Sequence, residues 1–422
     1  MISSFIEVFK NKDTRAKILF TMGMLLVYRL GCALVVPGID NSMINLSGNT
    51  ILNMMSLLGG GAISQMSVFA LGVGPYITAS IIIQLLSMDV IPYLTELAKE
   101  GNKGRQKMDR YTRYLAVVMS LVQGYFITRT LNATYSIIEN DSFAGYAYVS
   151  IMFTAGTMFL LWIGDRITAK GIGNGTSLII FSGIVANLPY TFRMVFASTV
   201  GTQSAGWLLF TIYLVMYLLI IVLVTVMQLA ERRIPIQYTS SSVQNRTKGD
   251  MNHLPLKVNS ASVIPVIFSS ALLQAPQIIL SWINYDLYDK WSKILNLTHP
   301  YMIVFYALLI TLFTFFYTNL EVDPSKISER LSKQNGYIPG VRPGKETREY
   351  ISNVLNRITV LGAIFLVFIA VLPYIVSGVS GLPTSAALGG TGIIIVVGIA
   401  IETHKGLVSQ LTQKSYKGFI GR

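Results

Sequence analysis

Residues 72–88 read GVGPYITASIIIQLLSM, an apolar run without a charged side chain. The run approaches the length of about 20 residues that a helix needs to cross the hydrocarbon core of a bilayer. Pro75 fits the first turn of this helix, where a backbone N–H would have no partner within the helix. The preceding residues 51–68 are semi-apolar but are interrupted by the glycine run 59–61, so they do not predict a spanning helix. A short segment folded partway into a membrane needs protein or a water-filled cavity around its backbone, and this segment therefore indicates a cavity open to the outside.

Nine further apolar stretches follow the same pattern. Hydrophobic residues make up 52% of the chain and charged residues only 13%, whereas a soluble chain carries about 25% charged residues. The mean hydropathy is +0.55. The first stretch runs on too long for a secretory signal peptide, and we expect no cleavage after it. We therefore expect an all-α polytopic membrane protein. Its ten expected spans are residues 17–36, 72–88, 112–131, 147–165, 175–191, 207–227, 260–283, 301–320, 352–374 and 386–402.

Positive charge is concentrated on one side of this arrangement. All but five of the 33 Lys and Arg residues lie in or next to the two tails and the loops after spans two, four, six and eight. The five others are Arg29, within the first span, and Arg129, Arg193, Lys290 and Lys293, on the opposite side. Because Lys and Arg mark cytoplasmic loops, we expect both ends of the chain in the cytoplasm. The excess of Lys and Arg in cytoplasmic loops then accounts for most of the net charge of +13.

The expected spans are almost free of charge, although ion and proton carriers normally hold Asp, Glu, Lys or His within their helices. Arg29 is the main exception, and we interpret it as a snorkelling or paired arginine near the outer end of the first span. The sequence contains no nucleotide-binding loop, metal-ligand cluster or catalytic triad, and the single Cys32 excludes an intrachain disulfide. We therefore expect no cofactor.

Runs of isoleucine at residues 81–83, 179–180 and 393–395 lie in three different spans. Most of these side chains must face lipid or neighbouring helices. A pore narrowed by the others would close by dewetting and would bind no particular solute. The remaining polar points are glutamines, each of which more often joins helices than binds a substrate. They are Gln84, Gln123 and Gln274.

Two loops on the positive side are long, residues 228–259 and 321–350. Both are polar and basic, with Pro and Gly at intervals. Loops of this length in a compact protein are usually functional or disordered.

Several motifs, in order along the whole chain, closely resemble the SecY family of protein-translocation channels. The second span with its lead-in, FALGVGPYITASIIIQLL at 69–86, is similar to the family's second span. The other matching stretches are PGID at 37–40, EGNKGRQK at 100–107, YTRY at 111–114, KGIGNG at 170–175, GIVA at 183–186, HLPLKVN at 253–259, VIPVIF at 263–268, IPGVRPG at 338–344 and GGT at 389–391.

This resemblance implies a passive channel without enzymatic activity, through which unfolded secretory proteins pass and from which membrane proteins leave sideways into the bacterial cytoplasmic membrane. It implies two pseudo-symmetric halves of five helices around an hourglass pore with a plug. The halves would be residues 1–195 and 196–422. The implied partners are SecE and SecG, the SecA motor ATPase or a translating ribosome as the source of energy, and the signal sequences and nascent chains that are carried. The resemblance also implies contact with membrane lipid and, through the basic loops, with ribosomal RNA.

The resemblance also assigns roles to single residues. A ring at the pore constriction is implied at Ile77, Ile81, Ile180, Ile184, Ile267 and Ile395. The plug is implied at about residues 57–66, with Leu57, Gly60, Ile63 and Met66. A lateral gate between spans two and three and spans seven and eight would have a polar seam of Gln84, Gln123 and Gln274. Docking of the motor or ribosome is implied for Arg232, Arg233, Arg246, Lys248 and Arg342, and Pro and Gly on both sides of Arg342 indicate a stiff turn.

Three other interpretations were open at the level of sequence. A secondary transporter would need charged or hydrogen-bonding side chains near the midplane, and the expected spans lack them. An insertase or scaffold without a channel would have no use for a plug-like segment. An accessory SecY with few substrates differs from the housekeeping form only in subtype, and the intact basic loops favour the latter.

Overall fold

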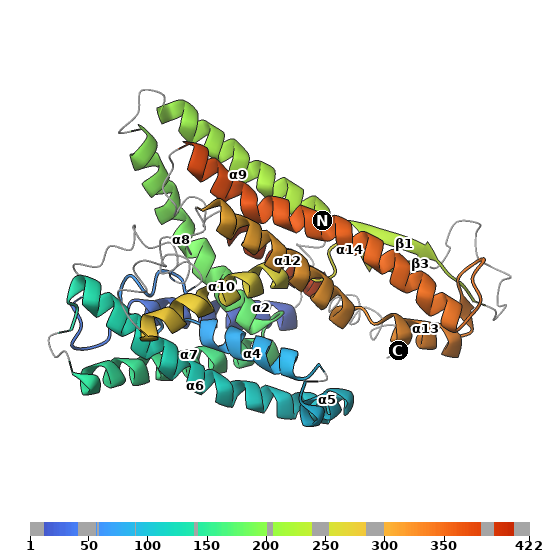
Figure 1. Cartoon of the computed structure of the whole chain (residues 1–422), viewed down its shortest axis with the longest axis horizontal. Coiled ribbons are helices and arrows are strands. Elements are labelled where there is room, and N and C mark those ends of the chain that lie inside the picture. The colour runs from blue at the N-terminus through green and yellow to red at the C-terminus, as the bar shows by residue number, and fades with distance from the viewer. Residues whose placement is uncertain are drawn as a thin grey trace.

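The computed structural model describes residues 12–40, 56, 59–88, 90–138, 142–200, 206–238, 253–283, 299–380 and 392–408. Within these residues the fold is a bundle of long helices (Figure 1). The helices are α2 (Lys12–Cys32), α4 (Gly74–Leu86), α5 (Pro92–Lys99), α6 (Asn102–Tyr135), α7 (Phe143–Lys170), α8 (Gly175–Val200), α9 (Gly206–Leu229), α10 (Ile264–Ile283), α12 (Pro300–Glu321), α13 (Pro324–Lys333), α14 (Lys345–Ser380) and a final helical segment at 392–408.

Each of the ten expected spans falls on one of these helices, and α5 and α13 are additional. Among the described residues, six helices are long and apolar enough to cross a membrane by length and composition alone, and α4 and α10 contribute shorter apolar helices. In Figure 1, α4, α6 and α7 lie together on one side and α9, α12 and α14 on the other, with α8 and α10 between them. Helix α10 also contacts α4 and α6, so the two groups meet there.

Several helices extend beyond the expected spans. Helix α6 begins at Asn102 and not at residue 112, because its basic first turns continue the helix outside the apolar stretch. Helix α8 passes through Pro189 and ends at Val200 and not at residue 191. Neighbouring helices can compensate for the N–H that an internal proline lacks, so a proline in a membrane helix does not have to end it. A hydropathy pattern predicts where the apolar part of a helix lies. It does not predict how far the helix continues into polar or proline-containing residues.

The two long loops are partly ordered and are joined to each other. Strand β1 (Glu231–Pro235) pairs antiparallel with β3 (His253–Lys257). Strand β2 (Gln237–Tyr238) from the first loop pairs antiparallel with β4 (Gly336–Tyr337) from the second. We call this assembly, together with α13, the loop platform.

A separate hydrophobic core underlies the platform. Its buried members are Ile234, Ile236, Leu256, Leu331, Ile338, Ile351 and Ile358. Because these residues come from both loops and from α14, apolar burial fixes the two loops relative to the helix bundle. The short strands were not predicted from the sequence, since each is too short to show a hydrophobic period.

The segment before α4 packs directly against the helices. Ser67 pairs with Val35 in an isolated antiparallel bridge, and the Val68 N–H donates to the carbonyl of Leu34 across 2.9 Å. A Cβ at Gly156 of α7 would collide with the carbonyl oxygen of Val68. The glycine therefore allows this segment to lie against α7.

We predict that Gly156→Ala destabilises the fold, whereas Gly23→Ala in α2 does not, because nothing lies within 4 Å of a Cβ at Gly23. Overpacking of this kind costs about 1–3 kcal/mol. Thermal unfolding of the two purified variants in the same detergent measures the difference. Equal midpoints for the two variants would contradict the close packing of residue 68 on α7.

Candidate functional site

Six isoleucines from four separate parts of the chain meet in one hydrophobic cluster. Four are buried within it and two are partly buried and pack against it. The four buried members are Ile81, Ile180, Ile184 and Ile395, and the two partly buried members are Ile77 and Ile267. We call these six residues the isoleucine cluster. They are the residues for which the resemblance implied a ring; they share this large core with many other apolar side chains, and the ring itself stays a prediction.

The spacing within each helix explains how two elements supply two members each. Ile77 and Ile81 of α4 are four residues apart, as are Ile180 and Ile184 of α8, so each pair lies on one helix face. Isoleucine is branched at Cβ and therefore stiff, and it carries no polar atom. Such a cluster excludes water without forming a directed bond to anything that enters it.

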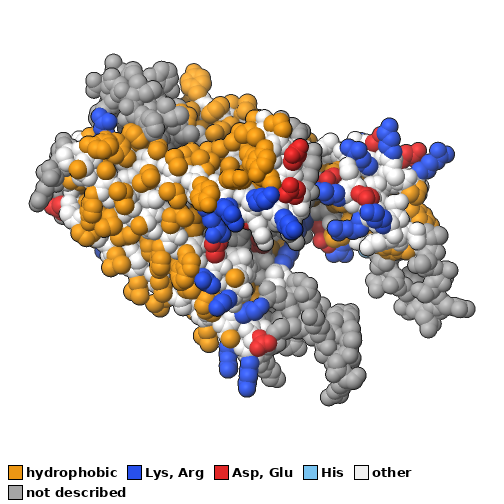
Figure 2. Space-filling model, turned by 90° about the horizontal axis from the view of Figure 1, so that it is seen from below, with side chains coloured by type: hydrophobic (Ala, Val, Ile, Leu, Met, Phe, Trp, Pro, Cys, Tyr) orange, Lys and Arg blue, Asp and Glu red, His pale blue; other side chains and the backbone are white. Residues whose placement is uncertain are grey.

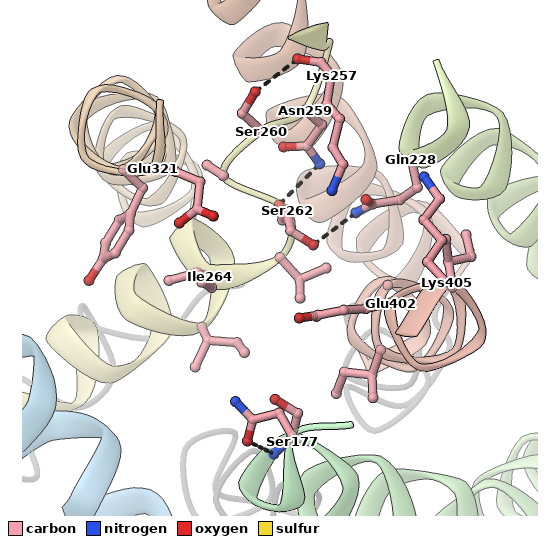
Figure 3. A pocket seen from close by; sticks show the side chains of 18 of the residues that line it. Ser177, Gln228, Lys257, Asn259, Ser260, Ser262, Ile264, Glu321, Glu402 and Lys405 are labelled. Atoms are coloured by element: carbon pink, nitrogen blue, oxygen red, sulfur yellow. Dashed lines mark hydrogen bonds between the residues drawn. The ribbon is translucent and has the colours of Figure 1, made fainter. Parts of the chain in front are cut away.

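A cavity of about 270 Å³ lies beside this cluster. Ile180 and Ile267 line it, and they are shared with the isoleucine cluster. The other lining side chains come from the ends of α8, α9 and α12, the residues around the start of α10 and the helical segment 392–408 (Figure 3). The walls of the cavity thus come from α9 and α12, from the two helices α8 and α10 that lie between the groups, and from the segment 392–408, with isoleucine on one side.

The charged groups of the cavity balance one another. Lys257 and Lys405 line it together with Glu321 and Glu402. In Figure 3 these side chains stand around an open centre; Lys257 and Glu321 come from separate elements, and Glu402 and Lys405 from the segment 392–408. Because two cations are matched by two anions, the cavity favours no single sign of charge. The arrangement suits a varied polar chain better than a small ion or an anionic solute.

Polar side chains near the cavity bond chiefly to one another and to the backbone. The Asn259 side-chain amide donates to the Ser262 carbonyl across 3.0 Å, and the Ser260 hydroxyl donates to the Lys257 carbonyl across 2.9 Å. These bonds, drawn in Figure 3, shape the turn that enters α10. Among the described residues, no three His, Cys, Asp or Glu side chains lie close enough to hold a metal ion.

The glycine segment, residues 59–66, is the described part of the stretch that the sequence assigned to a plug; Leu57 lies outside the described residues. Ile63 and Met66 are fully buried in a second hydrophobic cluster. Ala62 is buried in the same central cluster as the six isoleucines. The segment therefore touches the core that contains the isoleucine cluster.

Backbone conformation at the segment requires glycine. Gly60 and Gly61 have φ angles of +75° and +84°, a region that side chains rarely adopt. A Cβ at Gly60 would lie 3.1 Å from the Cα of Gly183 in α8. A Cβ at Gly61 would lie 2.9 Å from the side-chain oxygen of Asn187, also in α8. Glycine thus allows both the bend of the segment and its approach to α8.

Arg29, which the sequence left as a snorkelling or paired arginine, points at this segment. Its two terminal guanidinium nitrogens donate to the carbonyls of Gly60 and Ser182, across 3.0 and 3.2 Å. The neighbouring Tyr28 hydroxyl donates to the Gly59 carbonyl across 3.2 Å. The arginine is therefore paired with backbone carbonyls of two separate elements.

One hydrogen bond crosses between the two groups of helices at membrane depth. The Tyr317 hydroxyl of α12 donates to Oε1 of Gln84 in α4 across 2.6 Å. Gln84 also donates from Nε2 to the Ser80 hydroxyl within its own helix. Gln84 is thus a polar contact between α4 and α12, and the gate role that the resemblance implied for it stays a prediction. Tyr317 was missed, because a tyrosine in an apolar span carries no distinguishing signal.

Gln123 and Gln274 are the two other glutamines for which the resemblance implied a gate. Gln123 is buried within α6. Gln274 belongs to α10, and its side chain lies outside the described residues.

The basic residues of the first long loop are only partly placed. Arg232 and Arg233 are exposed on β1. The Arg233 Nε lies 2.8 Å from a carboxylate oxygen of Glu231, a pairing that the sequence did not predict. Arg246 and Lys248 lie outside the described residues. The described cations of this strand therefore point to solvent on the surface of the loop platform.

Arg342 extends from a tight turn, as the sequence predicted. Its side chain is 88% exposed. Gly340 and Gly344 have φ angles of +82° and +99°, which requires glycine on each side. The hydroxyl of Thr347 donates to the Arg342 carbonyl across 2.8 Å, and Ser328 donates to the Gly344 carbonyl across 2.8 Å. A rigid backbone thus presents an exposed guanidinium, which lies 3.9 Å from a carboxylate oxygen of Glu346.

Helix α13 beside this turn is capped by Asp323. Burial raises the pKa of the Asp323 carboxyl, but hydrogen bonds from the backbone N–H groups of Ser325 and Lys326 outweigh it, so its pKa lies below the ordinary value. Because the folded pKa is depressed, the cap stabilises the helix above the ordinary carboxyl pKa. That contribution is lost as the pH falls through the depressed value.

The surface agrees with the predicted separation of charge. Figure 2 shows hydrophobic side chains spread over the helical body. Lys and Arg side chains gather toward the end of that face that carries the loop platform and the start of α6. This is the side that the sequence assigned to the cytoplasm.

Comparison with known sequences identifies close relatives along the whole chain. The family model for SecY matches residues 67–404. The protein translocase subunit SecY of Bacillus licheniformis is 42% identical over 430 residues, covering 99% of this chain and 99% of that protein. The protein translocase subunit SecY of Bacillus subtilis is 41% identical over 428 residues, with 99% of each covered.

Solved structures share the fold. A structure described as that of a protein conducting channel matches with a TM-score of 0.64 and 18% identity, covering 94% of this chain and 92% of that chain. The Sec61 channel from a canine ribosome–channel complex matches with a TM-score of 0.62 and 17% identity, at the same coverage. The architecture of this chain is therefore that of these channels.

The bond between α4 and α12 gives a testable coupling. We predict that Tyr317→Phe and Gln84→Leu lower stability non-additively, with a coupling energy of about 1 kcal/mol in a double-mutant cycle. Thermal unfolding in detergent is the measurement. Tyr306→Phe on the same helix is the control, since the Tyr306 hydroxyl has no hydrogen-bond partner among the described residues. A coupling energy near zero for Tyr317 and Gln84 would show that the bond does not join the helices.

Proposed function

Because the chain belongs to the SecY family, we propose that it is the central protein-conducting channel of the Sec translocon. It passes unfolded secretory proteins across the membrane and releases membrane proteins sideways into the bilayer. The chain is a multi-pass membrane protein of the bacterial cytoplasmic membrane, with both ends in the cytoplasm. The single observation that carries the proposal is the isoleucine cluster beside a cavity lined by α8, α9, α10, α12 and the segment 392–408.

The path of the polypeptide follows from that geometry. An extended chain enters the charge-balanced cavity from the cytoplasm and meets Ile180 and Ile267. The isoleucine cluster is the constriction ring, which closes around the chain by apolar contact and binds no sequence tightly. In the idle state the same side chains exclude water and ions. The glycine segment is the described part of the plug and covers the ring from the outer side.

Sideways release uses the contact between the two groups of helices. The lateral gate lies between α4 and α6 on one side and α10 and α12 on the other, with Gln84 and Tyr317 as a polar contact across it. An apolar signal sequence that enters here exchanges this bond for hydrophobic contact. The two halves, expected from the sequence at residues 1–195 and 196–422, then move apart as units, with their boundary after the end of α8 at Val200.

Energy comes from a partner and not from this chain. The loop platform presents exposed arginines on one face, and such a face suits a motor ATPase, SecA, or a translating ribosome and its RNA. One of the similar structures is itself a channel in a ribosome–channel complex. SecE and SecG complete the complex, and lipid surrounds the apolar helices. The protein acts on signal sequences and nascent chains without changing them chemically.

The ring gives the first functional prediction. We expect Ile81→Asn to increase ion leakage of the idle channel several-fold and to permit export of a reporter with a defective signal sequence, because a wetted constriction no longer closes. The neighbouring Ile82→Asn is the control, since Ile82 lies outside the cluster formed by the described residues. Ion flux and export are measured in vesicles that contain the purified complex. Leakage that rises equally in both variants would argue against a ring at residue 81.

The loop platform, as the docking surface, gives the second functional prediction. We expect Arg342→Glu to stop SecA-driven export while assembly with SecE is preserved. The guanidinium donates directed hydrogen bonds, whereas a carboxylate has no hydrogen to donate and carries the opposite charge. Removing one partner of a desolvated charge pair costs about 2–5 kcal/mol. The control is Arg348→Glu, which makes the same charge change at another exposed arginine nearby. ATP-dependent translocation into vesicles is measured for both. An equal loss would leave only a general electrostatic attraction.

A further inference from the structure

Arg29 holds the glycine segment and α8 together through one side chain. Two nitrogens of its guanidinium reach two carbonyls that are separated by more than a hundred residues in the sequence, those of Gly60 and Ser182. No described carboxylate forms an ion pair with Arg29. The guanidinium carbon also lies 5.6 Å from the centre of the Tyr28 ring. The Arg29 side chain is thus oriented by the Tyr28 ring, and two of its guanidinium nitrogens donate the hydrogen bonds of this bridge.

The chemistry of the contact requires arginine. Hydrogen bonds from a charged donor are stronger than neutral ones, and the low dielectric of a membrane protein strengthens them further. A planar fork can address two carbonyls at once, whereas the compact ammonium of lysine acts as a single point of charge. The backbone carbonyl of Gly60 accepts this bond in a left-handed turn that glycine permits.

The bridge is adjacent to the isoleucine cluster. Ser182 lies between Ile180 and Ile184 on α8, and both isoleucines belong to the cluster. Gly60 approaches Gly183 so closely that a side chain would not fit between them. The position of the glycine segment is therefore coupled to the part of α8 that supplies two members of the cluster.

We propose that Arg29 is a positioning residue that fastens the glycine segment to α8 in the idle channel and thereby sets how stringently signal sequences are selected. This inference rests on the proposed channel function. A bond made only while the segment is in place stabilises the idle state and not the open one, so it must be broken each time the segment moves aside. Its strength consequently sets the threshold that a signal sequence has to overcome.

The test compares Arg29→Gln, Arg29→Lys and Tyr28→Phe in the assembled complex in vesicles. Arg129→Gln, which removes an exposed arginine from α6, is the control. Segment position is followed by labelling a cysteine placed at Ser64 with a membrane-impermeant maleimide. The background is Cys32→Ala, because Cys32 is the only native cysteine. Ion leakage and export of reporters with intact and defective signals are measured in parallel.

For Arg29→Gln we expect labelling at residue 64 to be about tenfold faster, as for the loss of a charge-assisted hydrogen bond. Leakage and export of the defective-signal reporter should rise with it, while export of the intact reporter is unchanged. Arg29→Lys should lie between Gln and the parent, and Tyr28→Phe should have the smallest effect. If Arg29→Gln does not assemble, Arg29→Lys decides the matter, since it keeps the charge and loses the fork.

Unchanged labelling in Arg29→Gln and Arg29→Lys would overturn the fastening role, as would an equal change in Arg129→Gln. Because labelling does not depend on transport, the two proposals fail separately. Normal export with unchanged labelling rejects only the role of Arg29. Faster labelling in Arg29→Gln than in the parent, together with a parent that exports no reporter, rejects only the channel function.

Discussion

Apolar contact at the isoleucine cluster is the interaction on which the rest of the structure depends. Helices α4, α8, α10 and the segment 392–408 each contribute isoleucine to it, within the larger apolar core that they share. Membrane helices have little hydrophobic drive to associate, because lipid is as apolar as they are. The cluster is therefore held by shape and packing, and a channel built on it can open without breaking strong bonds.

Two of the polar contacts between separate elements lie at the glycine segment and between α4 and α12. Arg29 and Tyr28 satisfy carbonyls of the glycine segment, and Tyr317 satisfies Gln84 between α4 and α12. A carbonyl left without a partner in an apolar environment costs free energy. These bonds consequently favour the arrangement of the glycine segment and the helices that the structure has.

The loop platform is held together by contacts of its own. Pairing of β2 with β4 and a core that includes Ile338 join the two long loops. Arg342 then projects from a turn that glycines and two side-chain hydrogen bonds hold in place. A rigid mount of this kind loses little entropy when a partner binds, which favours affinity.

The sequence by itself determined the membrane class, the number and order of the spans and the side that carries positive charge. Hydropathy and the Lys and Arg bias are properties of local composition, so the spans and their orientation can be predicted without a structure. The resemblance supplied the six isoleucines, but only the tertiary structure brought residues 77 to 395 into one cluster. The extension of α6 and α8, the strands of the loop platform, and the partners of Arg29 and Gln84 also required it. Each depends on contacts between segments far apart in the chain, and a side chain's partner across such a distance is decided by packing and not by its neighbours in sequence.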